Sequence, residues 1–193
     1  MSTITQSKTI SLAWLAAWTG VSGIGIVIGT LLPLQAIWSL GENASSDLPP
    51  ILIPIVGGSL LGLGIGLGVG IAQWLVLRLR GITGFRWLIS SIVGCILGGI
   101  VAIAISNAFS QQGEIVWVNL VAFGLFGAIL GAVQFLLSRD ILSNPSWIVA
   151  SAIGLAAAMA LMLGFSEASS AFALLGGLVY GLVTAVALRW SAK

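Results

Sequence analysis

Residues 66–78 read GLGVGIAQWLVLR, and the order of two glycines, one polar residue and a final arginine in this stretch decides the fold. The same order returns at 127–139 as GAILGAVQFLLSR and at 177–189 as GLVYGLVTAVALR. In all three copies the shared positions are four, three and five residues apart. Because positions i, i+4 and i+7 lie on one face of a helix, each copy predicts a helix with a stripe of small residues. We call this the arginine-ended motif.

A second motif precedes each arginine-ended motif, with a tryptophan, a serine and two small residues at i, i+4, i+7 and i+11. Its copies are Trp18, Ser22, Gly25 and Gly29; Trp87, Ser91, Gly94 and Gly98; and Trp147, Ser151, Gly154 and Ala158. We call it the tryptophan-led motif. On a helix in lipid, small residues at this spacing let a partner backbone approach closely, so we expect small faces to meet small faces. The chain therefore predicts three tandem two-helix repeats, at about 9–80, 86–140 and 147–190.

The composition places these repeats in a membrane. The chain has 193 residues, of which 59% are hydrophobic and 6% charged, against roughly 25% charged in soluble domains. A spanning helix needs about 20 apolar residues. Six stretches are close to this length: 9–32, 51–77, 87–104, 116–137, 147–163 and 171–188. We predict an all-α bundle of six transmembrane helices in a single integral membrane domain, 1–193, closed as a ring with pseudo-threefold symmetry about the membrane normal.

Charges predict the orientation of this bundle. All seven basic residues fall on one side of the six alternating spans: Lys8, Arg78, Arg80, Arg86, Arg139, Arg189 and Lys193. Four of the five acidic residues fall on the other side: Glu42, Asp47, Glu114 and Glu167. The basic side is expected to be cytoplasmic, so both termini should lie there. All eight tryptophans also lie near the predicted span ends, a placement typical of an interfacial aromatic belt.

The repeated polar position of the arginine-ended motif is the candidate ligand site. It holds Gln73, Gln134 and Thr184, well inside their spans. One interpretation is hydrogen bonding between helices, with Ser22, Ser91 or Ser151 as partners. The other is a polar ring that binds a small polar ligand or a pigment.

The arginines are candidates for contact with lipid or with a partner protein. Arg78, Arg139 and Arg189 end their motifs, and Arg80 and Arg86 lie in one short loop. A guanidinium at a helix end can extend toward the lipid headgroups without any specific partner. A specific contact with an anionic lipid or a partner protein is the alternative.

Residues that carry most enzyme chemistry are missing from the sequence. The chain has no histidine and one cysteine, Cys95, so we assign no catalytic residue, no metal site and no cofactor. No charged residue falls in the middle of a predicted span, where ion-coupled transporters usually carry one. We expect membrane lipids and other membrane protein subunits as partners, and no nucleic acid.

The strings GIAQWLVLR (70–78), followed by Trp87, and GAVQFLLSR (131–139), followed by Trp147, resemble a family of multi-pass proteins common in cyanobacteria and some other bacteria. The resemblance implies a bacterial inner membrane or a thylakoid membrane, and it supplies no activity. Six spans and the small-residue pair Ala13 and Ala17 are similar to the substrate-binding subunits of energy-coupling-factor vitamin transporters.

Two functions are compatible with these features. The first is a non-enzymatic structural or accessory subunit of a larger membrane assembly, with lipid or pigment in its helix seams. The alternative is a passive solute facilitator, or the substrate-binding subunit of a multi-component, vitamin-type transporter.

Overall fold

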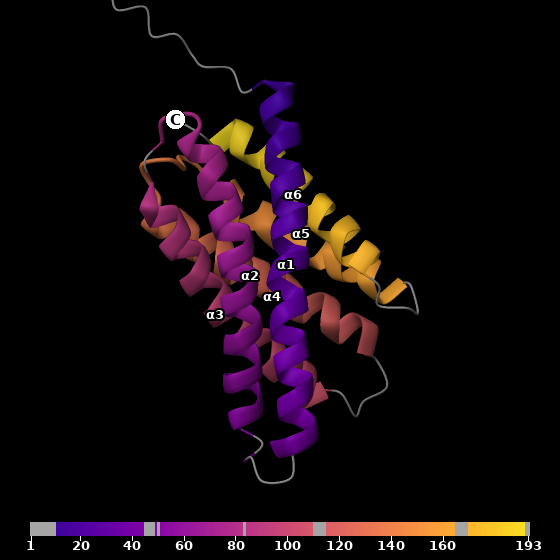
Figure 1. Ribbon diagram of the computed structural model, residues 1–193. Coiled ribbons are helices and arrows are strands. Elements are labelled where there is room, and N and C mark those ends of the chain that lie inside the picture. The colour runs from indigo at the N-terminus through magenta and orange to yellow at the C-terminus, as the bar shows by residue number, and fades with distance from the viewer. Residues whose placement is uncertain are drawn as a thin grey trace, which may run out of the picture.

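The computed structural model is all-helical, as predicted (Figure 1). It describes residues 11–44, 49, 51–82, 84–109, 115–164 and 170–191. Six helices run along these segments: α1 (Leu12–Ala44), α2 (Leu52–Arg78), α3 (Phe85–Phe109), α4 (Ile115–Leu137), α5 (Ser146–Gly164) and α6 (Ser170–Ser191). Several residues of the charge and belt predictions lie outside the described set: Lys8, Asp47, Glu114, Glu167 and Lys193, with the side chains of Trp38 and Glu42.

Five of the helices are long and apolar enough to cross a membrane, which indicates an integral membrane protein. The qualifying segments are Leu12–Leu31, Leu52–Arg78, Phe85–Phe109, Val116–Leu137 and Ala173–Trp190. The apolar part of α5, Ser146–Leu161, is shorter. A sixth crossing by α5 therefore stays a prediction.

Helix α1 is longer than the sequence predicted. The predicted span 9–32 agrees with the apolar segment Leu12–Leu31, but the helix itself continues through Pro33 to Ala44. Proline usually interrupts a helix because it lacks an N–H group and its ring crowds the preceding turn. Here the ring packs beside Gly64 of α2, where no side chain competes for the space.

The six helices form a closed ring. Each helix contacts the one before it and the one after it, and α1 contacts α6. Because consecutive helices alternate in direction, the end where α1 begins is also where α6 ends and where the α2–α3 and α4–α5 connections lie (Figure 1). All five arginines therefore lie at one end of the bundle: Arg78, Arg80, Arg86, Arg139 and Arg189.

The glycines of the arginine-ended motif mark close helix contacts. A methyl group added at the first glycine of each copy would lie 2.7–2.8 Å from a backbone Cα of the next helix in the ring. These pairs are Gly66 with Ile92, Gly127 with Ala152, and Gly177 with Gly23. The seams α2–α3, α4–α5 and α6–α1 therefore need a residue without a side chain.

The glycines of the tryptophan-led motif pack less uniformly than expected. Gly25 of α1 lies against the backbone of Gly68 of α2, so small faces meet there. In α3, Gly94 and Gly98 instead accept the large side chains of Leu130 and Phe126 from α4. The expectation that small faces always meet is therefore wrong for α3–α4, because large side chains are needed to fill the centre of the ring.

Replacement of Gly66 by Ala should destabilise the fold, whereas Gly57→Ala should not. The methyl group at 66 would push α2 and α3 apart, at a cost of about 1–3 kcal/mol. A methyl group at Gly57, on the same helix, meets no neighbouring atom within 4 Å, and alanine favours the helix by up to about 1 kcal/mol. Thermal unfolding of the two variants in detergent measures the difference, and equal midpoints would contradict the seam.

Candidate functional site

Three tryptophans meet in the centre of the ring, at the end that carries the arginines. Trp18 of α1, Trp87 of α3 and Trp147 of α5 have no solvent-exposed surface. Their ring centroids are 5.3–6.3 Å apart, and the ring planes meet edge to face at 67–79°. This geometry is favourable for aromatic pairs because a positive ring edge meets a negative ring face. We call this group the tryptophan cluster.

The expectation of an interfacial belt is wrong for these three residues. Each occupies the first position of the tryptophan-led motif, on the same stripe as the serine and glycines that face inward. Trp14 stacks on Trp18 at a centroid distance of 5.2 Å and is 9% exposed. Trp117 and Trp190 are 68% and 72% exposed, which is compatible with an interfacial position.

The polar position of the arginine-ended motif supports the tryptophan cluster. The Nε1–H group of Trp147 donates a hydrogen bond of 2.9 Å to Oε1 of Gln134, a fully buried side chain of α4. The Nε2 group of Gln134 donates a bond of 2.9 Å to Oγ of Ser91, on α3. One amide therefore joins three consecutive helices and satisfies a buried indole donor.

Gln73 makes the same two bonds one pair earlier in the ring. It accepts from Nε1 of Trp87 at 3.2 Å and donates to Oγ of Ser22 at 2.9 Å. The hydrogen-bonding interpretation of this position is therefore confirmed for Gln73 and Gln134, with two of the three predicted serine partners. In membranes such contacts stabilise by roughly 0.6–2 kcal/mol each.

The third copy keeps only half of this arrangement. Oγ1 of Thr184 accepts from Nε1 of Trp18 at 3.2 Å, and its own hydroxyl donates to the carbonyl of Tyr180 at 2.8 Å. Threonine has no amide to reach across to α5. Among the described residues, the buried hydroxyls of Ser151 and Tyr180 have no partner with hydrogen-bond geometry.

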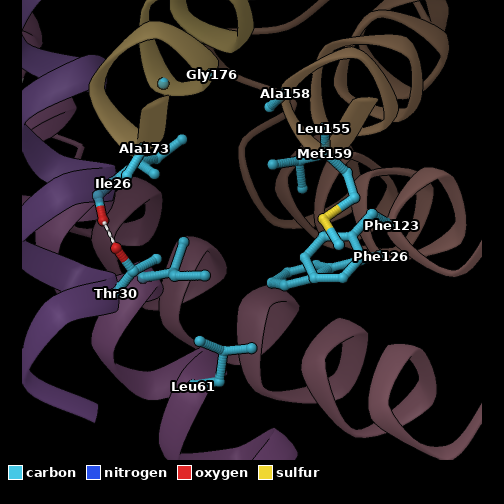
Figure 2. A pocket seen from close by; sticks show the side chains of 12 residues that line it. Ile26, Thr30, Leu61, Phe123, Phe126, Leu155, Ala158, Met159, Ala173 and Gly176 are labelled. Carbon is cyan, nitrogen blue, oxygen red and sulfur yellow. Dashed lines mark hydrogen bonds between the residues drawn. The ribbon is translucent and has the colours of Figure 1, made fainter. Parts of the chain in front are cut away.

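A cavity lies on the other side of the cluster from the arginines. It has a volume of about 140 Å³, and its lining is almost wholly apolar (Figure 2). Ile26, Leu61, Phe126, Leu155 and Gly176 contribute to its wall from five different helices. Thr30 has the one hydroxyl among the lining side chains that Figure 2 shows, and this hydroxyl donates a hydrogen bond of 2.8 Å to the carbonyl of Ile26. Apolar cavities of this size stay dry and accept small apolar molecules.

The third arginine-ended motif differs from the other two at the cavity wall. Eight residues before the polar position, the first two copies carry Ile65 and Phe126, and the third carries Gly176. All three line the cavity. Gly176 brings no side chain to this wall, and a methyl group there would already lie 3.1–3.3 Å from Ala158 of α5.

The predicted site residues fall into two separate places. Gln73, Gln134 and Thr184 surround the tryptophan cluster and do not line this cavity. Binding of a polar ligand or pigment by these three side chains stays a prediction.

Three arginines lie over aromatic rings at 4.9–5.5 Å: Arg78 over Trp74, Arg80 over Trp14 and Arg139 over Phe135. Arg86 and Arg189 are exposed.

Comparison with known proteins gives no relative: no protein-family model, no curated protein and no solved structure matches this chain. Within the described segments, no group of three or more His, Cys, Asp or Glu residues is placed to hold a metal ion. Cys95 is buried within α3.

Replacement of Gln134 by Leu should destabilise the fold by about 1–3 kcal/mol, because the buried Nε1–H group of Trp147 loses its acceptor. Trp147→Phe removes that donor. The double variant should therefore lose less stability than the sum of the two single variants. Unfolding of all four proteins in detergent gives this coupling energy, and strict additivity would contradict a functional bond between the two side chains.

Proposed function

We propose that this chain is a non-enzymatic structural or accessory subunit of a larger membrane assembly. The tryptophan cluster carries the proposal. It fills the centre of the ring at one end, and its indole N–H groups are bonded to buried side chains of neighbouring helices. A path for a polar solute would have to break several of these contacts at once, so the arrangement supports a rigid scaffold better than a conducting pore.

The proposal includes three equivalent helix pairs, α1–α2, α3–α4 and α5–α6. The first glycine of each arginine-ended motif packs in the same way against the pair that follows it in the ring, and corresponding tryptophans meet in the centre. We further propose that the end with the arginines is cytoplasmic, because basic residues accumulate on that side of membrane proteins. The sequence resemblance described above supports a bacterial inner membrane or a thylakoid membrane.

If the helix pairs are equivalent, residues of the second copy should fit at the corresponding positions of the third. Tyr180 and Thr184 of α6 correspond to Leu130 and Gln134 of α4. Thr184→Gln alone should cost about 1–3 kcal/mol, because the longer side chain meets the Tyr180 ring in a filled core. Tyr180→Leu in the same chain provides room and rebuilds the second copy, so the amide can reach Ser151.

The double variant should therefore be more stable than Thr184→Gln by at least about 1 kcal/mol in thermal unfolding. A matched control is Leu182→Ala with Thr184→Gln, since Leu182 is exposed on the same helix. Rescue by the control, or none by Tyr180→Leu, would contradict the equivalence.

Gentle extraction of the tagged chain from its native membrane tests the function itself. A subunit should migrate with partner proteins as one particle in a native gel and in gel filtration, and the partners should be identifiable by mass spectrometry. A tagged, unrelated polytopic protein from the same membrane is the control. Recovery of the chain alone would contradict the accessory role.

A second candidate is binding of a small apolar solute, either for passive facilitation or for delivery within a multi-component transporter. The apolar cavity beside Gly176 favours it. In the same extraction, a chain recovered alone with a retained small molecule would support this candidate over the first.

A further inference from the structure

The outer surface of the α1–α2 pair carries an open apolar groove of about 520 Å³. On α2 its lining residues follow one stripe from Leu60 to Leu75, and on α1 they run in the opposite direction from Pro33 to Ile24. Fifteen residues of helix correspond to a length of about 22 Å, more than one leaflet of a hydrocarbon core of about 30 Å. The groove is therefore long enough to take an extended acyl chain.

Two glycines create this groove in the first helix pair. Gly64 and Gly68 lie in its floor against the backbone of α1, so neither contributes a side chain to the outer surface. The corresponding positions carry large residues in the other two pairs: Leu125 and Ile129 in α4, and Leu175 and Val179 in α6.

The groove leads toward two arginines. Arg78 lies seven residues after Ile71 and three after Leu75, so it continues the α2 stripe that lines the groove. On α1, Trp14 lies eleven residues before Gly25, again on the stripe that faces the seam, and Arg80 covers its ring at 4.9 Å. The two guanidinium groups are thus held at the arginine end of the same helix pair.

The charge at this end is not balanced by acidic residues of the neighbouring sequence. Residues 48–113 contain Arg78, Arg80 and Arg86 and no Asp or Glu. In contrast, Arg139 at the end of α4 is followed directly by Asp140. An anionic headgroup therefore matches the α1–α2 end better than the end of α4, since guanidinium groups bind phosphate oxygens well.

We propose that the α1–α2 pair binds one anionic phospholipid from the leaflet on the arginine side. One acyl chain lies in the groove, and Arg78 and Arg80 bind the phosphate. This inference rests on the proposed function only in that the chain spans a membrane. It adds the class of lipid, the leaflet and the residues that select it.

Native mass spectrometry of the purified chain tests the headgroup. The probes are phosphatidylglycerol and phosphatidylcholine with identical acyl chains, added to the detergent-solubilised protein. The wild type should retain one phosphatidylglycerol in preference to phosphatidylcholine. Each of Arg78→Gln and Arg80→Gln should lower that preference about fivefold, and both together roughly thirtyfold. Arg86→Gln removes the same charge from the first turn of α3, a helix that does not line the groove, and should leave the preference within about twofold.

Variants that fill the groove test the acyl chain. Ala72→Trp places a large ring among the groove-lining residues and should lower the bound fraction of both lipids at least about fivefold. Ile71→Trp, at an exposed position on the same stripe, is a second variant that does not depend on the first one folding. Leu182→Trp is the matched control on the outer face of α6 and should bind as the wild type does.

Several results would overturn the proposal. They are equal retention of the two lipids, an equal effect of Arg86→Gln, or unchanged binding in both groove variants. Displacement of the lipid by glycerol phosphate alone would assign the site to a soluble phosphate. A change of oligomeric mass in the groove variants, without a change in bound lipid, would assign the groove to a protein helix. None of these results bears on the extraction experiment, since that measurement follows protein partners from the native membrane.

Discussion

The structure depends on the need of each indole N–H group of the tryptophan cluster for an acceptor. In the centre of six apolar helices there is little else to bond, and an unpaired donor costs about 1–3 kcal/mol. Gln73, Gln134 and Thr184 supply the acceptors, one for each member of the tryptophan cluster. Because each acceptor comes from a different helix than its tryptophan, the bonds fix both the order of the helices and their rotation. The polar residues in these spans thus specify the packing.

The glycine seams make those bonds geometrically possible. An amide side chain is short, so Gln134 reaches Ser91 and Trp147 only if α3, α4 and α5 are close together. Gly131 permits that approach, since a methyl group there would lie 2.9 Å from Cβ of Ser151. Lipid provides no hydrophobic drive for helices to associate, so close packing and these polar contacts must supply the free energy together. Neither feature would be effective without the other.

The sequence predicted the helices and the serine partners well, since both follow from strict periodicity. It did not predict the burial of Trp18, Trp87 and Trp147, although the stripe they share with the inward-facing serines contained that information. General statistics place tryptophan near span ends at the membrane surface, and that expectation outweighed the local pattern. The continuation of α1 past Pro33 was also missed, because the space that the Pro33 ring occupies lies beside Gly64 of another helix. The groove and the cavity arise from differences between copies, which matter only once the helices are placed side by side.

Those differences show how repeated pairs can acquire separate properties. The first pair has Gly64 and Gly68 where the others carry large residues, and it combines an outer groove with basic residues that have no acidic neighbour in sequence. The third pair has Gly176 in the interior, and the cavity adjoins it. Both changes lie away from the tryptophan cluster. The hydrogen bonds made by Gln73 and Gln134 are therefore intact, and Thr184 keeps the bond to its tryptophan. A scaffold fixed at one level of the bundle can therefore tolerate losses of side-chain volume at other levels, and such losses are what create space for a ligand.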